Sequence, residues 1–134
     1  RTMLNFEILK DKADAVIVGS SALYLQGISK KIPNDIDIIT TSIKGLPDGV
    51  IEYETDSGFS FSGKRAVCIV DDSFKIDIFV EDNLPDYIEI DGLKIQTVAS
   101  MFNYYQSILP RVKDYWLPEI NNKIKLLSSW MEKI

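Results

Sequence analysis

The sequence contains no histidine and a single cysteine among its 134 residues. The missing histidine excludes His-based acid–base catalysis, Ser-His-Asp triads and histidine-ligated zinc. The lone cysteine, Cys68, excludes an intramolecular disulfide and favours a reducing, cytoplasmic setting. Its apolar neighbours predict a buried thiol rather than a nucleophile. Any chemistry must therefore depend on carboxylates, lysines, hydroxyls and a hard metal ion.

The chain also lacks a long apolar run and an excess of basic residues. No run approaches the roughly 20 apolar residues that cross a bilayer, and the first residues do not have the layout of a signal peptide, so we expect no membrane partner. The net charge is −5, and residues 48–91 hold twelve acidic and three basic side chains. This acidic middle argues against a broad nucleic-acid footprint, although the first and last segments leave room for a local basic groove.

Length and hydrophobic periodicity predict one α/β (α+β) domain over residues 1–134, with a mixed central β-sheet and flanking helices. Its core is expected at 14–96 and its C-terminal helices at 97–134. The Asp91-Gly92 pair predicts a β-hairpin within 87–96. The other expected elements are a short helix at 3–12, a helix at 21–27 that a serine caps and Gly27 stops, strands at 14–18, 35–40, 50–55, 65–70 and 75–80, and helices near 98–109 and 120–131.

Two aspartates, Asp35 and Asp37, interrupt an otherwise apolar strand. Because strand side chains alternate, both project from the same face, with Cα atoms roughly 7 Å apart. Their charges repel unless a cation compensates them. Asp77 lies in a similar apolar strand and joins them if the two strands are neighbours. Oxygen ligands without histidine point to Mg²⁺ or Mn²⁺ on these three residues; the alternative is three solvated aspartates on an exposed face.

A glycine turn precedes the first of these strands. Gly19 and Ser20 follow an apolar strand and lead directly into a helix, which places backbone N–H groups and a hydroxyl at a positive helix end. Such a turn suits a phosphate group. The alternative is a serine that caps the helix with nothing bound.

In combination, these motifs resemble the DNA polymerase β-type nucleotidyltransferase superfamily. That family has an apolar residue, Gly-Gly or Gly-Ser, a helix, an Asp-x-Asp among apolar residues, and later a single Asp between apolar residues. The resemblance covers about residues 14–80, and it is carried by Val18-Gly19-Ser20, Asp35-Ile36-Asp37-Ile38 and Ile76-Asp77-Ile78.

Further along the chain, "GLKIQTVASMF" and "RVKDYW" look like the corresponding part of small nucleotidyltransferases of the abortive-infection, type IV toxin group. Family members commonly carry an Arg and then a Thr or Ser before the first aspartate. This chain has Lys31 and Pro33 at those places.

The resemblance implies a nucleotidyltransferase-like fold and Mg²⁺-dependent transfer of an NMP group from an NTP, such as ATP, to an acceptor. It implies that Gly19, Ser20 and Lys31 hold the phosphates, and that Lys113 helps to hold the nucleotide. It further implies that Asp35, Asp37 and Asp77 are metal ligands and catalytic residues.

The acceptor is left open among tRNA, protein and small molecules, and a partner protein could supply it. Two other functions are also left open. One is a nucleotide-binding or interaction domain without turnover, for which the proline at position 33 is the reason. The other is a sugar-nucleotide glycosyltransferase that uses its Asp-x-Asp on Mg²⁺.

Overall fold

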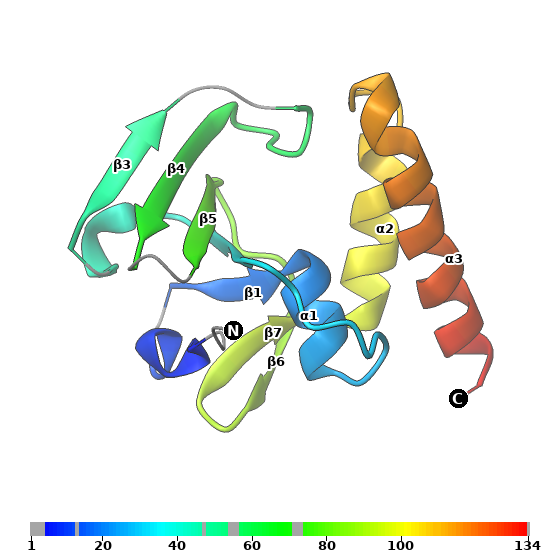
Figure 1. The fold of residues 1–134 in the computed structure, drawn as a ribbon, viewed down its shortest axis with the longest axis horizontal. Helices are drawn as coiled ribbons and strands as arrows, with labels where there is room; N and C mark the ends of the chain where they lie inside the picture. The colour runs from blue at the N-terminus through cyan, green and yellow to red at the C-terminus, as the bar shows by residue number, and fades with distance from the viewer. Residues whose placement is uncertain (1–4, 13, 47, 54–56, 71–73, 134) are drawn as a thin grey trace.

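The computed structural model describes residues 5–12, 14–46, 48–53, 57–70 and 74–133, and these form a mixed seven-stranded sheet with flanking helices (Figure 1). The predicted fold class is confirmed. The strands are β1 (Val16–Val18), β2 (Ile36–Thr40), β3 (Val50–Tyr53), β4 (Lys64–Ile69), β5 (Lys75–Val80), β6 (Tyr87–Ile90) and β7 (Leu93–Gln96). The helices are α1 (Gly19–Leu25), α2 (Val98–Ile108) and α3 (Leu117–Glu132), with 3₁₀ turns η1 (Phe6–Leu9), η2 (Ile43–Gly45) and η3 (Asp114–Trp116).

The strand order is β3-β4-β5-β2-β1-β7-β6, which places β5 and β2 next to each other near the centre. β2 and β5 are parallel, and their register sets Asp37 directly opposite Asp77. β1 runs antiparallel to β2 on its other side and sets Val18 opposite Asp37. Sequence periodicity predicted the strands, and the sheet order now shows that the two aspartate-bearing strands are neighbours.

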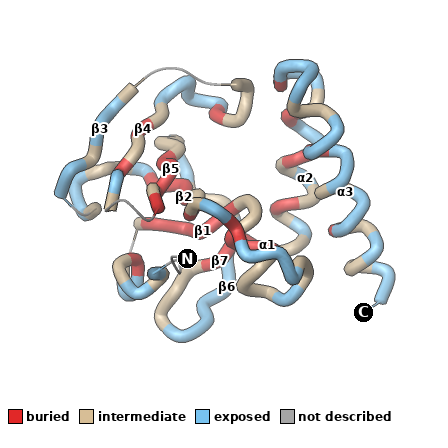
Figure 2. The backbone as a smooth tube through the Cα atoms, viewed as in Figure 1, coloured by how far each residue is buried: buried red, intermediate tan, exposed pale blue. Residues whose placement is uncertain are grey.

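The two faces of these central strands differ sharply in character. Alternation along β2 and β5 turns four isoleucines away from the aspartate face, and each is at most 1% exposed. They belong to the main hydrophobic core, which also includes buried residues of α1, α2 and α3. Figure 2 shows this burial concentrated in the central strands, whereas much of the surface of α3 is exposed. The isoleucines are Ile36, Ile38, Ile76 and Ile78.

Helices α2 and α3 pack against each other and lie together on one side of the sheet (Figure 1). Thr97 caps α2 by accepting a hydrogen bond from the Ser100 backbone N–H at 3.1 Å. The helix ends at Ile108, just before Pro110, as predicted. None of the helices among the described residues is long and apolar enough to span a membrane.

The start of α1 differs from the prediction. The helix begins at Gly19, directly after β1, and no serine side chain caps it. Instead, the buried Ser21 hydroxyl donates a hydrogen bond to the Asp35 carbonyl oxygen at 3.0 Å. The prediction failed because this hydroxyl has a tertiary partner at the start of β2. The expected stop is confirmed: Gly27 follows the helix with φ +76°.

The remaining predictions concern the hairpin, the N-terminal helix and two segments of the middle strands. The hairpin is confirmed: β6 and β7 pair antiparallel, and Asp91 and Gly92 have φ of 52° and 82° at the turn. The helix predicted at 3–12 is only the 3₁₀ turn η1 within its described part, because Asn5 caps the Glu7 N–H and the turn ends at Leu9. The predicted turn between β4 and β5 falls mainly on residues 71–73, outside the described residues, and so does the end of the strand predicted at 50–55.

Candidate active site

A cavity of about 420 Å³ lies between the aspartate face of the sheet and the C-terminal helices. Its volume is in the range of small-molecule sites, about 300–1,000 Å³. The glycine turn, the three aspartates and Lys31 all line this cavity, so the structure brings most of the predicted site together. The predicted lining residues are Gly19, Ser20, Lys31, Asp35, Asp37 and Asp77.

Asp37 is the electrostatic centre of the cavity. The pKa of its carboxyl is raised from 3.8 to about 7, first by burial and then by the negative charges of Asp77 and Asp35, against lowering by Lys123 and Arg65. The two paired strands thus hold Asp77 close enough to Asp37 to disfavour ionisation of Asp37. A cation placed at this point would relieve the repulsion.

Gly19 is in direct contact with Asp37. Its φ is +64°, and a Cβ built on it would lie only 2.6 Å from Oδ2 of Asp37. Only glycine fits both the left-handed backbone and this close approach. The glycine turn and the Asp-x-Asp motif are therefore two parts of one site.

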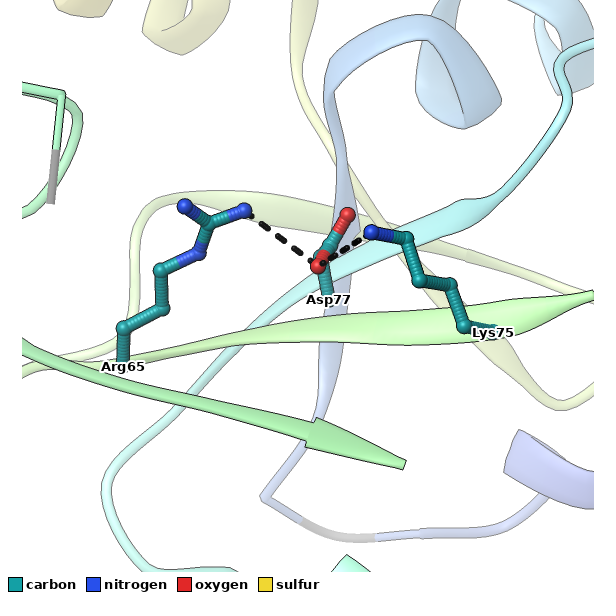
Figure 3. Close-up of polar contacts among 3 residues, drawn as sticks. All are labelled: Arg65, Lys75 and Asp77. Atoms are coloured by element: carbon teal, nitrogen blue, oxygen red, sulfur yellow. Dashed lines mark hydrogen bonds and ion pairs between the residues drawn. The ribbon is translucent and has the colours of Figure 1, made fainter. Parts of the chain in front are cut away.

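Asp77 is only 8% exposed and is ion-paired with two cationic side chains (Figure 3). Its Oδ1 accepts from Nη2 of Arg65 at 3.3 Å and lies 3.6 Å from Nζ of Lys75. Arg65 comes from β4, and its guanidinium also lies over the Phe79 and Tyr53 rings, 5.2 and 5.4 Å from their centroids. These contacts hold the Asp77 side chain in place and partly neutralise it.

The donor set suits a hard divalent cation, because the cavity offers carboxylate oxygens from Asp35, Asp37 and Asp77. In the structure, Asp77 is ion-paired with the protein's own cationic side chains, Arg65 and Lys75. No group of three or more acidic or cysteine side chains among the residues the structure describes is arranged to hold an ion. A cation bound here would be held mainly by Asp37 and Asp77, and Asp35, just before β2, would be a further ligand.

The lysines divide into two groups. Lys31 lines the cavity from the exposed loop before β2. Lys123 lines it from α3, and Nζ lies 5.5 Å from the centroid of the Tyr105 ring. Lys113 is exposed, caps η3 and is outside the cavity lining. Sequence reasoning missed Lys123 because its place depends on how α3 packs against α2 beside the cavity.

Aromatic side chains form the remaining wall of the cavity. Phe59 and Trp116 meet edge to face with ring centroids 5.2 Å apart, and both line the cavity. The ring centroid of Phe59 also lies 6.5 Å from that of Phe79, which projects from β5 on the same face as Asp77. No sequence pattern predicts this wall, because residues 57–63 have no regular periodicity and Trp116 stands between two helices.

No protein-family model matches the chain, and no curated protein matches it in sequence. Two solved structures resemble its fold. One is a candidate nucleotidyltransferase from H. pylori, with a TM-score of 0.49 and 20% identity over 73% of this chain. The other is JHP933 from Helicobacter pylori, with a TM-score of 0.47 and 19% identity over 73% of this chain. The chain spans about half the length of these structures, 52% and 51% respectively.

Proposed function

We propose that this chain is a nucleotidyltransferase that transfers an NMP group from an NTP to an acceptor hydroxyl with the help of Mg²⁺ or Mn²⁺. The observation that carries the proposal is the direct pairing of Asp37 with Asp77 in one cavity, against the Gly19 turn. Two partly buried carboxylates side by side are costly without a compensating cation. A carboxylate pair beside a glycine turn suits transfer at phosphorus.

In this reaction the acceptor oxygen attacks the α-phosphorus, the bond to pyrophosphate breaks, and pyrophosphate leaves. Gly19 allows the backbone to approach the phosphates closely, and Ser20 offers a hydroxyl donor. The divalent cation, held by Asp35, Asp37 and Asp77, would neutralise charge on the triphosphate and the leaving group. Asp77 takes the proton of the acceptor hydroxyl.

Cationic side chains complete the proposed triphosphate site. Lys31 and Lys123 both line the cavity, one from the loop before β2 and one from α3. Lysine serves here as a point charge, without the forked geometry of arginine. Lys113 lies on the surface outside the cavity lining, so its predicted role applies to a nucleotide or acceptor that extends beyond the cavity.

Two observations favour a second candidate, a nucleotide-binding domain without turnover. Asp77 is already ion-paired with Arg65 and Lys75, and the buried Pro33, at the place where the resembling family carries a Thr or Ser, lines the cavity. A protein of this kind binds an NTP in the same cavity but releases no pyrophosphate.

The test is an incubation with each NTP labelled at the α-phosphate, with Mg²⁺ or Mn²⁺ and with tRNA, protein extract or small-molecule acceptors. We expect label on one acceptor class and release of pyrophosphate. Asp37→Asn should abolish both, whereas the matched control Asp86→Asn, an exposed residue away from the cavity, should leave them unchanged. NTP binding without pyrophosphate release establishes the second candidate, and absence of NTP binding overturns both.

A further inference from the structure

We propose that the aromatic wall, Phe59 and Trp116, is the nucleobase subsite of this cavity; the inference rests on the proposed function. The cavity is lined by two chemically different kinds of group. Carboxylates, the glycine turn and lysines are of one kind, and aromatic rings, including those of Phe59 and Trp116, are of the other. A nucleoside triphosphate offers a partner to each kind, because it carries anionic phosphates and a flat ring.

The wall is rigidly built. Tyr104 OH donates a hydrogen bond to the Phe59 carbonyl oxygen, and the Arg111 guanidinium donates one to the Ser60 carbonyl oxygen. Glu81 accepts hydrogen bonds from the backbone N–H groups of Phe61 and Ser62, both at 2.9 Å. These bonds fasten residues 59–62 to α2, to the segment before α3 and to the end of β5. The Phe59 ring is therefore held in position before any ligand arrives, which lowers the entropic cost of binding.

Trp116 adds a polar feature to the wall. Its indole N–H is buried and makes no hydrogen bond of good geometry among the described residues. The phenol of the neighbouring Tyr115 lies close to this N–H, and its pKa is lowered first by a hydrogen bond with Ser57 and also by Trp116. A buried donor of this kind calls for an acceptor. The ring nitrogens and carbonyls of a nucleobase provide one, while the ring itself stacks on aromatic side chains.

The two tryptophans of the chain make the proposal measurable. In Trp130→Phe, which changes a residue of α3 outside the cavity lining, Trp116 is the remaining fluorophore. We expect NTPs with Mg²⁺ to quench its emission. Inorganic tripolyphosphate, which has the phosphates but no base, should compete with the NTP without quenching.

A second measurement compares affinities by calorimetry. Phe59→Leu should weaken NTP binding about tenfold and leave tripolyphosphate binding within about twofold, because stacking contributes only to the base. Trp116→Phe, which keeps a ring and removes the N–H, should weaken NTP binding about threefold. The matched control is Phe61→Leu, two residues away, 56% exposed and outside the cavity lining, which should change neither affinity.

The outcomes separate the two proposals. If tripolyphosphate and NTPs bind the wild-type chain equally well and neither variant discriminates between them, the base subsite is overturned and the phosphate site stands. If neither ligand binds the wild-type chain, both proposals are overturned. Should Phe59→Leu lose its circular dichroism spectrum, Trp116→Phe and the quenching of Trp116 decide the question.

Discussion

Gly19 and Asp37 are in such close contact that a Cβ on the glycine would stand 2.6 Å from Oδ2 of the aspartate. We therefore expect Gly19→Ala to lower the free energy of unfolding by about 2–4 kcal/mol, from the left-handed backbone and the displaced carboxylate together. Urea denaturation measures the change.

Gly27→Ala is the matched control, because Gly27 also has a positive φ, at +76°, but nothing lies within 4 Å of its Cβ position. We expect it to cost only the backbone contribution, about 1 kcal/mol. Equal destabilisation in the two variants would show that contact with Asp37 is unimportant.

The raised pKa of Asp37 makes stability depend on pH. Between the unfolded value of 3.8 and the folded value of about 7, the folded chain holds a proton that the unfolded chain has released. Stability from this group is therefore full below pH 4 and is lost as the pH rises towards 7 and beyond. Relative to wild type, Asp37→Asn should gain stability as the pH rises, by about 2–4 kcal/mol between pH 4 and pH 8. Denaturation at a series of pH values checks this, and parallel curves for the two proteins would contradict it.

Asp77 and Asp35 raise the pKa of Asp37 to different extents, and Asp77 has the larger effect. NMR titration of the Asp37 carboxyl carbon should show a fall in pKa in Asp77→Asn and a smaller fall in Asp35→Asn. The distant Asp86→Asn should produce no change. A larger fall in Asp35→Asn than in Asp77→Asn would contradict the direct pairing of Asp37 with Asp77.

Gly58 fixes the approach of the aromatic wall to the segment before α3. Its φ is +94°, and a Cβ there would lie 2.4 Å from the Arg111 carbonyl oxygen, a backbone atom that cannot easily move. Gly58→Ala should therefore destabilise the chain by about 2–4 kcal/mol and change the near-ultraviolet circular dichroism of Trp116. Gly63→Ala, with φ +75° and nothing within 4 Å, should cost only about 1 kcal/mol and leave that spectrum as in wild type.

The sequence predicted those parts of the fold that depend on local patterns. Alternation of apolar residues located β5 at 75–80, and the Asp91-Gly92 pair located the hairpin, because turn geometry there is set by two residues. The serine cap of α1 was wrong because the Ser21 hydroxyl bonds to a carbonyl oxygen 14 residues later. Local propensity carries no information about such a partner.

Those residues of the candidate site that belong to a local sequence pattern were likewise predictable. The glycine turn and the aspartates can be recognised from the sequence, since carboxylates within apolar strands, beside a glycine that directly follows such a strand, are unusual. Arg65, Lys123 and Trp116 carry none: an arginine on a strand, a lysine on a helix and a tryptophan between helices are ordinary. Only the sheet order and the packing of α3 against α2 bring them to the cavity.

The position of β5 between β4 and β2 determines which strands must be paired before the carboxylate pair exists. Asp37 and Asp77 are 40 positions apart in the chain, yet they become neighbours only when β5 inserts at the middle of the sheet. Contacts of long sequence separation carry the entropy cost of closing a long loop. The carboxylate pair therefore requires the pairing of β2 with β5, and a nascent chain that ends before residue 75 contains only half of it.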